Sequence, residues 1–299
     1  MDTATLDSVA SAPSAETAVQ RPISSPVLPP LSAVEADLGI DPAMGGVTLP
    51  PRKPVFGIPV SVTHYDEVVD CVISLAKQGV RGSVQFLSAH GLVLATRDDT
   101  FAKAASHFSI TCPDGQPVRW AINRYHNAGL TDRCYGPETT LRTMAAAERE
   151  GVSVYLYGGK SDELLDQLVG ELAKRFPKLK IAGRQSPPFR QLSDEEHNEV
   201  AREINASGAG ICFIGLGCPK QEMFCDRHRD DVKPVMMAVG AAFDFIAGNT
   251  PQAPAWMQKR GLEWFYRLCT EPRRLFKRYA VTNSRFLWLW FTNRPGRAD

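Results

Sequence analysis

The sequence has neither a cysteine framework nor a metal-binding motif. Its seven cysteines are an odd, scattered set with no Cys-x-x-Cys pair, and its six histidines show no His-x-x-x-His or His-Glu-x-x-His spacing. This pattern favours reduced thiols and indicates no structural zinc site. No Asp-x-Asp triad occurs either, so the usual carboxylate grip on a metal-bound diphosphate is missing. We expect no metal and no other cofactor.

Signals for membrane crossing and for common phosphate loops are also absent. The start of the chain has no basic stretch followed by an apolar one, and the apolar run Phe286–Phe291 is far short of the roughly 20 residues that span a bilayer. Neither a Gly-x-Gly-x-x-Gly nor a Walker loop is found, which disfavours dinucleotide binding and ATP hydrolysis. A net charge of +1 argues against a nucleic-acid partner.

Composition divides the 299 residues into three parts. Residues 1–50 are rich in Ala, Ser, Thr and Pro and contain no aromatic side chain, which predicts a disordered leader. Residues 51–255 alternate between strand and helix patterns. Residues 256–299 hold four of the five tryptophans and a formal charge of +7, whereas the rest of the chain carries −6. We expect this last part to be a basic, amphipathic helical appendage that docks on an anionic membrane surface.

The middle part predicts an α/β, Rossmann-like fold with a mostly parallel sheet and helices on both faces, because nearly all-apolar strands alternate with helices. Ligands of such sheets bind beyond the carboxyl ends of the strands. The first strand is expected over 55–60, followed by a helix capped by Thr63. The later strands are expected over 83–88, 108–111, 152–157, 179–183, 210–216 and 235–239.

A rigid corner places a carboxylate at one of these strand ends. In Cys112-Pro113-Asp114-Gly115, the proline ring fixes one φ angle and Gly115 can adopt the positive φ of a tight turn. A positioned carboxylate can accept a proton, so Asp114 is the candidate catalytic base. An ordinary turn aspartate is the alternative from these residues alone.

Three further turns fall at the same edge of the predicted sheet. Tyr157-Gly158-Gly159-Lys160-Ser161 opens a helix whose free N–H groups favour an anion, although a plain strand-to-helix turn would look the same. Gly215–Glu222 offers glycines for close backbone approach, a lysine cation and a glutamine amide. Gly240–Asp244 brings a carboxylate that could instead be a buried cap. We expect all four turns to share one site.

Several strings together resemble the WecG/TagA/CpsF glycosyltransferase family. They run in order from about residue 55 to residue 280 and comprise Cys112–Trp120, Tyr135–Glu138, Tyr157–Lys160, Gly215–Glu222, Val239–Asp244, Ala253–Met257, Gly261–Trp264 and Glu271–Arg274. The resemblance implies an inverting, metal-independent glycosyltransferase. Its reaction would move a hexose or N-acetylhexosamine from a UDP-sugar donor to a polyprenyl diphosphate-linked sugar acceptor in exopolysaccharide or surface polysaccharide synthesis.

The same resemblance implies roles for particular residues. Asp114 would be the base, and the lipid diphosphate would meet Arg273, Arg274 and Arg278. The resemblance places Gln221 by the reacting sugars. Together with the turns described above, we expect donor or substrate binding at Ser88, Gly158, Gly159, Lys160, Gly217, Lys220, Gln221 and Asp244. The implied location is cytoplasmic, peripheral on the inner face of the cell membrane.

Departures from the family pattern at Phe86–His90 and Pro187–Phe189 leave the donor and acceptor sugars open. The sequence also leaves open whether the protein forms a homo-oligomer. Two other classes stand as alternatives. A nicotinamide oxidoreductase would need the phosphate fingerprint that is absent. A non-catalytic nucleotide-binding or membrane-adaptor protein would use the Rossmann-like domain to carry the basic tail.

Overall fold

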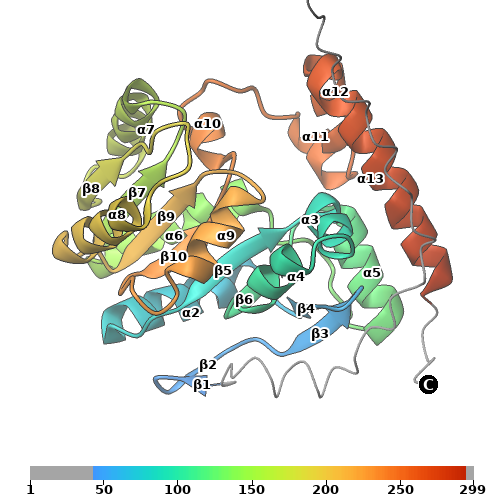
Figure 1. Ribbon diagram of the computed structural model, residues 1–299, viewed down its shortest axis with the longest axis horizontal. Helices are drawn as coiled ribbons and strands as arrows, with labels where there is room; N and C mark the ends of the chain where they lie inside the picture. The colour runs from blue at the N-terminus through green and yellow to red at the C-terminus, as the bar shows by residue number, and fades with distance from the viewer. Residues whose placement is uncertain (1–42, 294–299) are drawn as a thin grey trace, which may run out of the picture.

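The computed structural model describes residues 43–293, apart from the side chains of Ala255, Lys259 and Arg274. A six-stranded sheet forms its centre (Figure 1). All neighbouring strands in it are parallel, which confirms the α/β fold with a parallel sheet. In spatial order the strands are β6 (Ile110–Pro113), β5 (Ser83–Leu87), β10 (Val235–Ala238), β9 (Ile211–Gly215), β7 (Val154–Gly158) and β8 (Ile181–Gln185).

The central strands are buried on both faces because their side chains alternate between two cores. In β7, Val154 and Leu156 belong to one core, whereas Tyr155 and Tyr157 belong to the other. The first core includes residues of α2 (Tyr65–Gln78), α6 (Gly136–Glu150), α7 (Asp162–Arg175) and α10 (Ala242–Ile246). The second core includes residues of α8 (Asp194–Ala206) and α9 (Lys220–Arg227).

Local signals set the ends of the helices. Gly79 ends α2 in the left-handed conformation, with φ 65°, and Ser193 forms a capping box with Glu196 at the start of α8. The predicted cap of α2 by Thr63 was wrong. His64 is the N-cap, and its ring accepts a hydrogen bond from the Glu67 N–H. The Thr63 hydroxyl instead donates to the Glu67 carboxylate at 2.8 Å.

Two short hairpins lie outside the main sheet. The single strand expected over 55–60 was wrong, because Phe56 and Gly57 adopt φ 50° and 86° and reverse the chain between β3 (Arg52–Val55) and β4 (Ile58–Ser61). The other hairpin pairs β1 (Ala43–Met44) with β2 (Val47–Thr48), and Leu49 after it packs in the first core. Ordered structure is therefore present before the expected leader boundary at Pro50. Residues 1–42 of that leader lie outside the described residues.

The C-terminal segment is helical and runs along one side of the molecule (Figure 1). It comprises α11 (Ala255–Lys259), α12 (Glu263–Thr270) and α13 (Pro272–Thr292). Phe286 and Leu289 of α13 are buried in a third core with residues of the β3–β4 hairpin, α3 (Ala89–Ala95), α4 (Asp99–Ser106) and α5 (Gln116–His126). The last helix is thus packed on the domain. None of the helices in residues 43–293 is both long enough and apolar enough to cross a membrane.

Candidate active site

A pocket of about 1840 Å³ opens at the carboxyl edge of the sheet. Side chains and glycines that follow all six strands line it, and α12 and α13 close another side. Nine of the residues proposed from the sequence are among its lining: Ser88, Asp114, Gly159, Lys160, Gly217, Lys220, Gln221, Asp244 and Arg278. The structure therefore brings the four predicted turns together at one site.

Asp114 stands on the corner that follows β6. Its backbone N–H donates to the Leu87 carbonyl at 3.1 Å, which ties the corner to the end of β5, and Gly115 has the positive φ of 89° that the sequence predicted. Asp114 lines the pocket and is half-buried. This burial raises the pKa of Asp114 to about 7, although the positive charge of Arg133 opposes the shift. A carboxyl that titrates near neutrality suits general base chemistry.

A polar cluster next to Asp114 joins the domain to the C-terminal helices. The Arg133 guanidinium donates to the Glu263 carboxylate at 2.6 Å and lies 4.3 Å from the centre of the Tyr135 ring. The Tyr135 hydroxyl donates to the other Glu263 oxygen, also at 2.6 Å. We did not assign these residues from the sequence. The strings Tyr135–Glu138 and Gly261–Trp264 were nevertheless part of the family pattern, and that signal could have found two of them.

Gln221 lines the pocket, but its amide is engaged within the protein. Its Oε1 accepts from the Gly217 N–H at 3.1 Å, and its Nε2 donates to the Ala238 carbonyl at 3.1 Å and to Glu222 at 3.2 Å. These bonds connect the turn after β9 to the end of β10. In this structure Gln221 therefore shapes the pocket wall, whereas the sequence suggested direct contact with a ligand.

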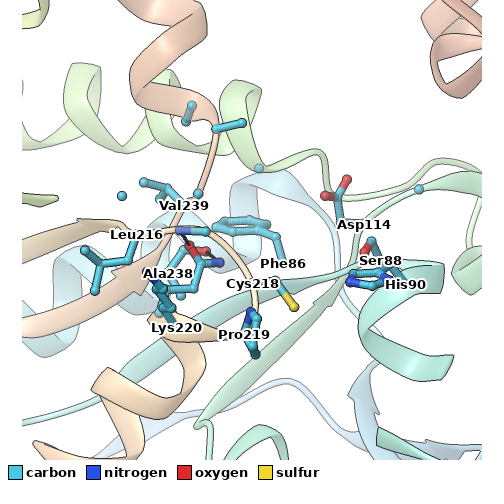
Figure 2. A pocket seen from close by; sticks show the side chains of 18 of the residues that line it. Phe86, Ser88, His90, Asp114, Leu216, Cys218, Pro219, Lys220, Ala238 and Val239 are labelled. Carbon is cyan, nitrogen blue, oxygen red and sulfur yellow. Dashed lines mark hydrogen bonds between the residues drawn. The ribbon is translucent and has the colours of Figure 1, made fainter. Parts of the chain in front are cut away.

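Ser88 and His90 lie on the same side of the pocket as Asp114, whereas Leu216, Lys220 and Val239 gather on the other side in the view of Figure 2. The Ser88 hydroxyl accepts from the Gly91 N–H at 3.5 Å and caps α3. Burial lowers the pKa of His90 to about 4, and the nearby Arg278 acts in the same direction. The His90 ring is therefore neutral at pH 7.

Two predicted residues lie elsewhere. Gly158 does not contribute to the pocket lining. It is buried where a Cβ atom would come within 2.6 Å of the Gly215 backbone, so packing requires the glycine. Arg273 is exposed at the start of α13 and does not line the pocket, and the side chain of Arg274 lies outside the described residues. Arg267 of α12, which we did not predict, does line it.

Within residues 43–293, no three His, Cys, Asp or Glu side chains gather where they could hold a metal ion. Fold and site together define a Rossmann-like α/β protein with its ligand pocket at the carboxyl edge of a parallel sheet and a carboxyl of raised pKa inside it.

The model of the glycosyl transferase WecG/TagA/CpsF family matches residues 53–299, and the chain belongs to that family. The chain is also similar to the N-acetylglucosaminyldiphosphoundecaprenol N-acetyl-beta-D-mannosaminyltransferase of Bacillus subtilis (strain 168). The two are 30% identical over 194 residues, which cover 63% of this chain and 73% of the relative.

Proposed function

We propose that this glycosyltransferase moves a sugar from a UDP-sugar to a sugar carried on a polyprenyl diphosphate, with Asp114 as the base. The observation that carries the proposal is the placement of Asp114, a carboxyl with a pKa of about 7 that faces a pocket large enough for two substrates. The name of the Bacillus relative describes a lipid-linked sugar diphosphate acceptor and supports the same acceptor class.

The reaction would be a single displacement. The Asp114 carboxylate takes the proton of the acceptor hydroxyl while that oxygen bonds to the anomeric carbon of the donor sugar. The bond from that carbon to the diphosphate breaks, and UDP leaves with the electron pair. Attack from the face opposite UDP inverts the configuration, and one positioned base is the group that such a step requires.

Positive groups on the far side of the pocket would meet the departing UDP. Lys160 lies just before α7, which begins at Asp162, and Lys220 is the first residue of α9. Cations and the N–H groups of helix N-termini stabilise developing negative charge on a leaving phosphate. Because the sequence has no Asp-x-Asp triad, we propose that these groups serve in place of a metal ion.

The acceptor would enter from the side of the C-terminal helices. Arg267 and Arg278 line the pocket there and suit a diphosphate. Phe276, Leu287 and Phe291 of α13 are exposed. Such apolar side chains beside basic ones favour an anionic membrane surface, where the lipid carrier would lie. We propose that the protein lies at the cytoplasmic face of the cell membrane.

A donor screen tests the proposed function. The full-length protein is incubated with a synthetic N-acetylglucosamine diphosphate lipid and separate UDP-sugars, namely UDP-glucose, UDP-N-acetylmannosamine and its uronic acid. The expected result is disaccharide lipid from one donor, with unchanged yield after EDTA is added. If none of these donors gives disaccharide lipid, that result would count against the proposed reaction. If EDTA abolishes the product, that result would count against a metal-independent reaction.

A further inference from the structure

We infer that Glu263 is a positioning residue that latches α12 over the pocket through Arg133 and Tyr135. We call these three residues the Glu263 latch. The inference rests on the proposed function for its catalytic meaning, but the contact itself can be tested without turnover.

The contacts of the Glu263 latch are short and mostly shielded from water. Both carboxylate oxygens of Glu263 accept hydrogen bonds at 2.6 Å, one from the Arg133 guanidinium and one from the Tyr135 hydroxyl. The side chains of Arg133 and Glu263 are 9% and 13% exposed. Charge-assisted hydrogen bonds of this kind are the stronger ones, and loss of one partner leaves the other charge buried and unsatisfied.

The latch matters because no residue of α12 is fully buried. Every residue of α12 keeps part of its surface exposed. Its position on the domain therefore depends on polar contacts more than a helix with a buried apolar face would.

A second contact lies between the residues just before α12 and the turn that carries Asp114. Gly261, with φ 71°, lies so close to Gln116 that a Cβ atom would come within 2.7 Å of the Gln116 Cγ atom. Gln116 follows Asp114 and Gly115 directly and begins α5. The backbone at Gly261, just before α12, thus lies against Gln116, while Glu263 binds Arg133.

This placement gives the latch an electrostatic effect on Asp114. The positive charge of Arg133 lowers the pKa of the Asp114 carboxyl, and the negative charge of Glu263 raises it. A free Arg133 would make Asp114 a weaker base. When α12 is in place, Glu263 offsets that charge. Arg267, on the same helix, also lowers the pKa of Asp114, but less strongly than Glu263 raises it. Removing the Glu263 charge alone, with both arginines kept, should therefore lower this pKa.

The test compares full-length Glu263→Gln with Glu138→Gln, a control that removes an exposed carboxylate paired with Arg142 at 2.8 Å. Loss of the Glu263 charge lowers the pKa of Asp114. We therefore expect the acid limb of the kcat/KM profile to move about one pH unit toward lower pH, with kcat reduced about tenfold. Hydrogen exchange of the α12 amides should also become about tenfold faster. In Glu138→Gln the profile and the exchange should match the wild type.

Tyr135→Phe separates the contact from the charge and covers the case in which Glu263→Gln does not fold. It removes one hydrogen bond but leaves the Glu263 carboxylate, so exchange of α12 should accelerate while the acid limb stays in place. The inference would be overturned if the α12 amides of either variant exchange no faster than those of Glu138→Gln. It would also be overturned if the acid limb of the Glu263→Gln profile stays in place. If no UDP-sugar is turned over, the proposed function fails, and the exchange measurement alone decides whether the latch exists.

Discussion

The ammonium nitrogen of Lys160 lies 2.8 Å from a carboxylate oxygen of Asp244. The two residues follow different strands, β7 and β10, and both line the pocket. The Lys160 side chain is 70% exposed, whereas Asp244 is 20% exposed. The carboxylate is therefore part of the pocket wall, and the lysine can leave it to meet a phosphate.

Lys160→Ala should weaken the binding of UDP about tenfold, because a hydrogen bond from a cation to a phosphate contributes about 1.5 kcal/mol or more. Stability should change by less than about 1 kcal/mol, since the ion pair is exposed. Titration calorimetry with UDP measures the affinity. Lys174→Ala is the matched control, because Lys174 is an exposed lysine on α7 that pairs with Glu171. Equal affinities in the two variants would remove Lys160 from the donor site.

Gln221→Ala should destabilise the fold by about 2 kcal/mol or more, because it leaves the Gly217 N–H and the Ala238 carbonyl without their amide partner. Urea denaturation monitored by fluorescence measures this change. Gln78→Ala at the exposed end of α2 should leave the unfolding midpoint unchanged. A stable Gln221→Ala with weak substrate binding would instead favour direct contact with the ligand.

Asp114 should make the protein less stable as pH rises. Its pKa is raised from 3.8 to about 7 in the folded state, so the folded state binds this proton more tightly than the unfolded state does. The free energy of unfolding therefore falls between about pH 4 and pH 7 on account of this group. Asp114→Asn removes the effect and should be more stable than the wild type at pH 8, by roughly 1–3 kcal/mol.

Thermal unfolding of Asp114→Asn and wild type across this pH range checks the prediction. The advantage of the variant should be greatest above pH 7 and should shrink toward pH 4 and below, as the wild-type carboxyl becomes protonated in both states. A stability difference that stays constant with pH would mean that the carboxyl is not perturbed.

Phe286→Ala should destabilise the protein by about 3–5 kcal/mol. The ring is 7% exposed and packs edge-to-face on Phe56 with 5.4 Å between ring centres. Phe276→Ala is the matched variant on the same helix, at a ring that is 68% exposed. It should retain wild-type stability but bind anionic vesicles less tightly in a sedimentation assay. A stability loss shared by both variants would contradict this division of α13 into a packed face and a docking face.

Features that depend on residues close together in the chain could be predicted from the sequence. The parallel sheet follows from all-apolar strands, and the Asp114 corner follows from its proline and glycine neighbours. Contacts between distant residues could not be predicted. Arg133 and Glu263 are 130 positions apart, and no spacing pattern pairs an arginine in a turn with a glutamate at the start of a helix.

Local patterns are also ambiguous where two physical causes favour the same residue type. Gly158 looks like a phosphate-turn glycine, yet close packing against the Gly215 backbone is what excludes a side chain there. Gln221 looks like a ligand-binding amide, yet its own backbone neighbours use its hydrogen bonds. In the run 55–60, apolar residues suggested one strand, but the turn at Phe56 and Gly57 divides it. In each case the deciding partner comes from the folded structure.

The most direct test of the central claim is the turnover of Asp114→Asn with the UDP-sugar that the wild type accepts and the same lipid-linked acceptor. The amide keeps the shape of the side chain but cannot take the proton, so kcat should fall by about 10²–10⁴-fold while the affinity for UDP stays within about twofold. Turnover within about tenfold of the wild type, in a folded variant, would contradict the assignment of Asp114 as the base.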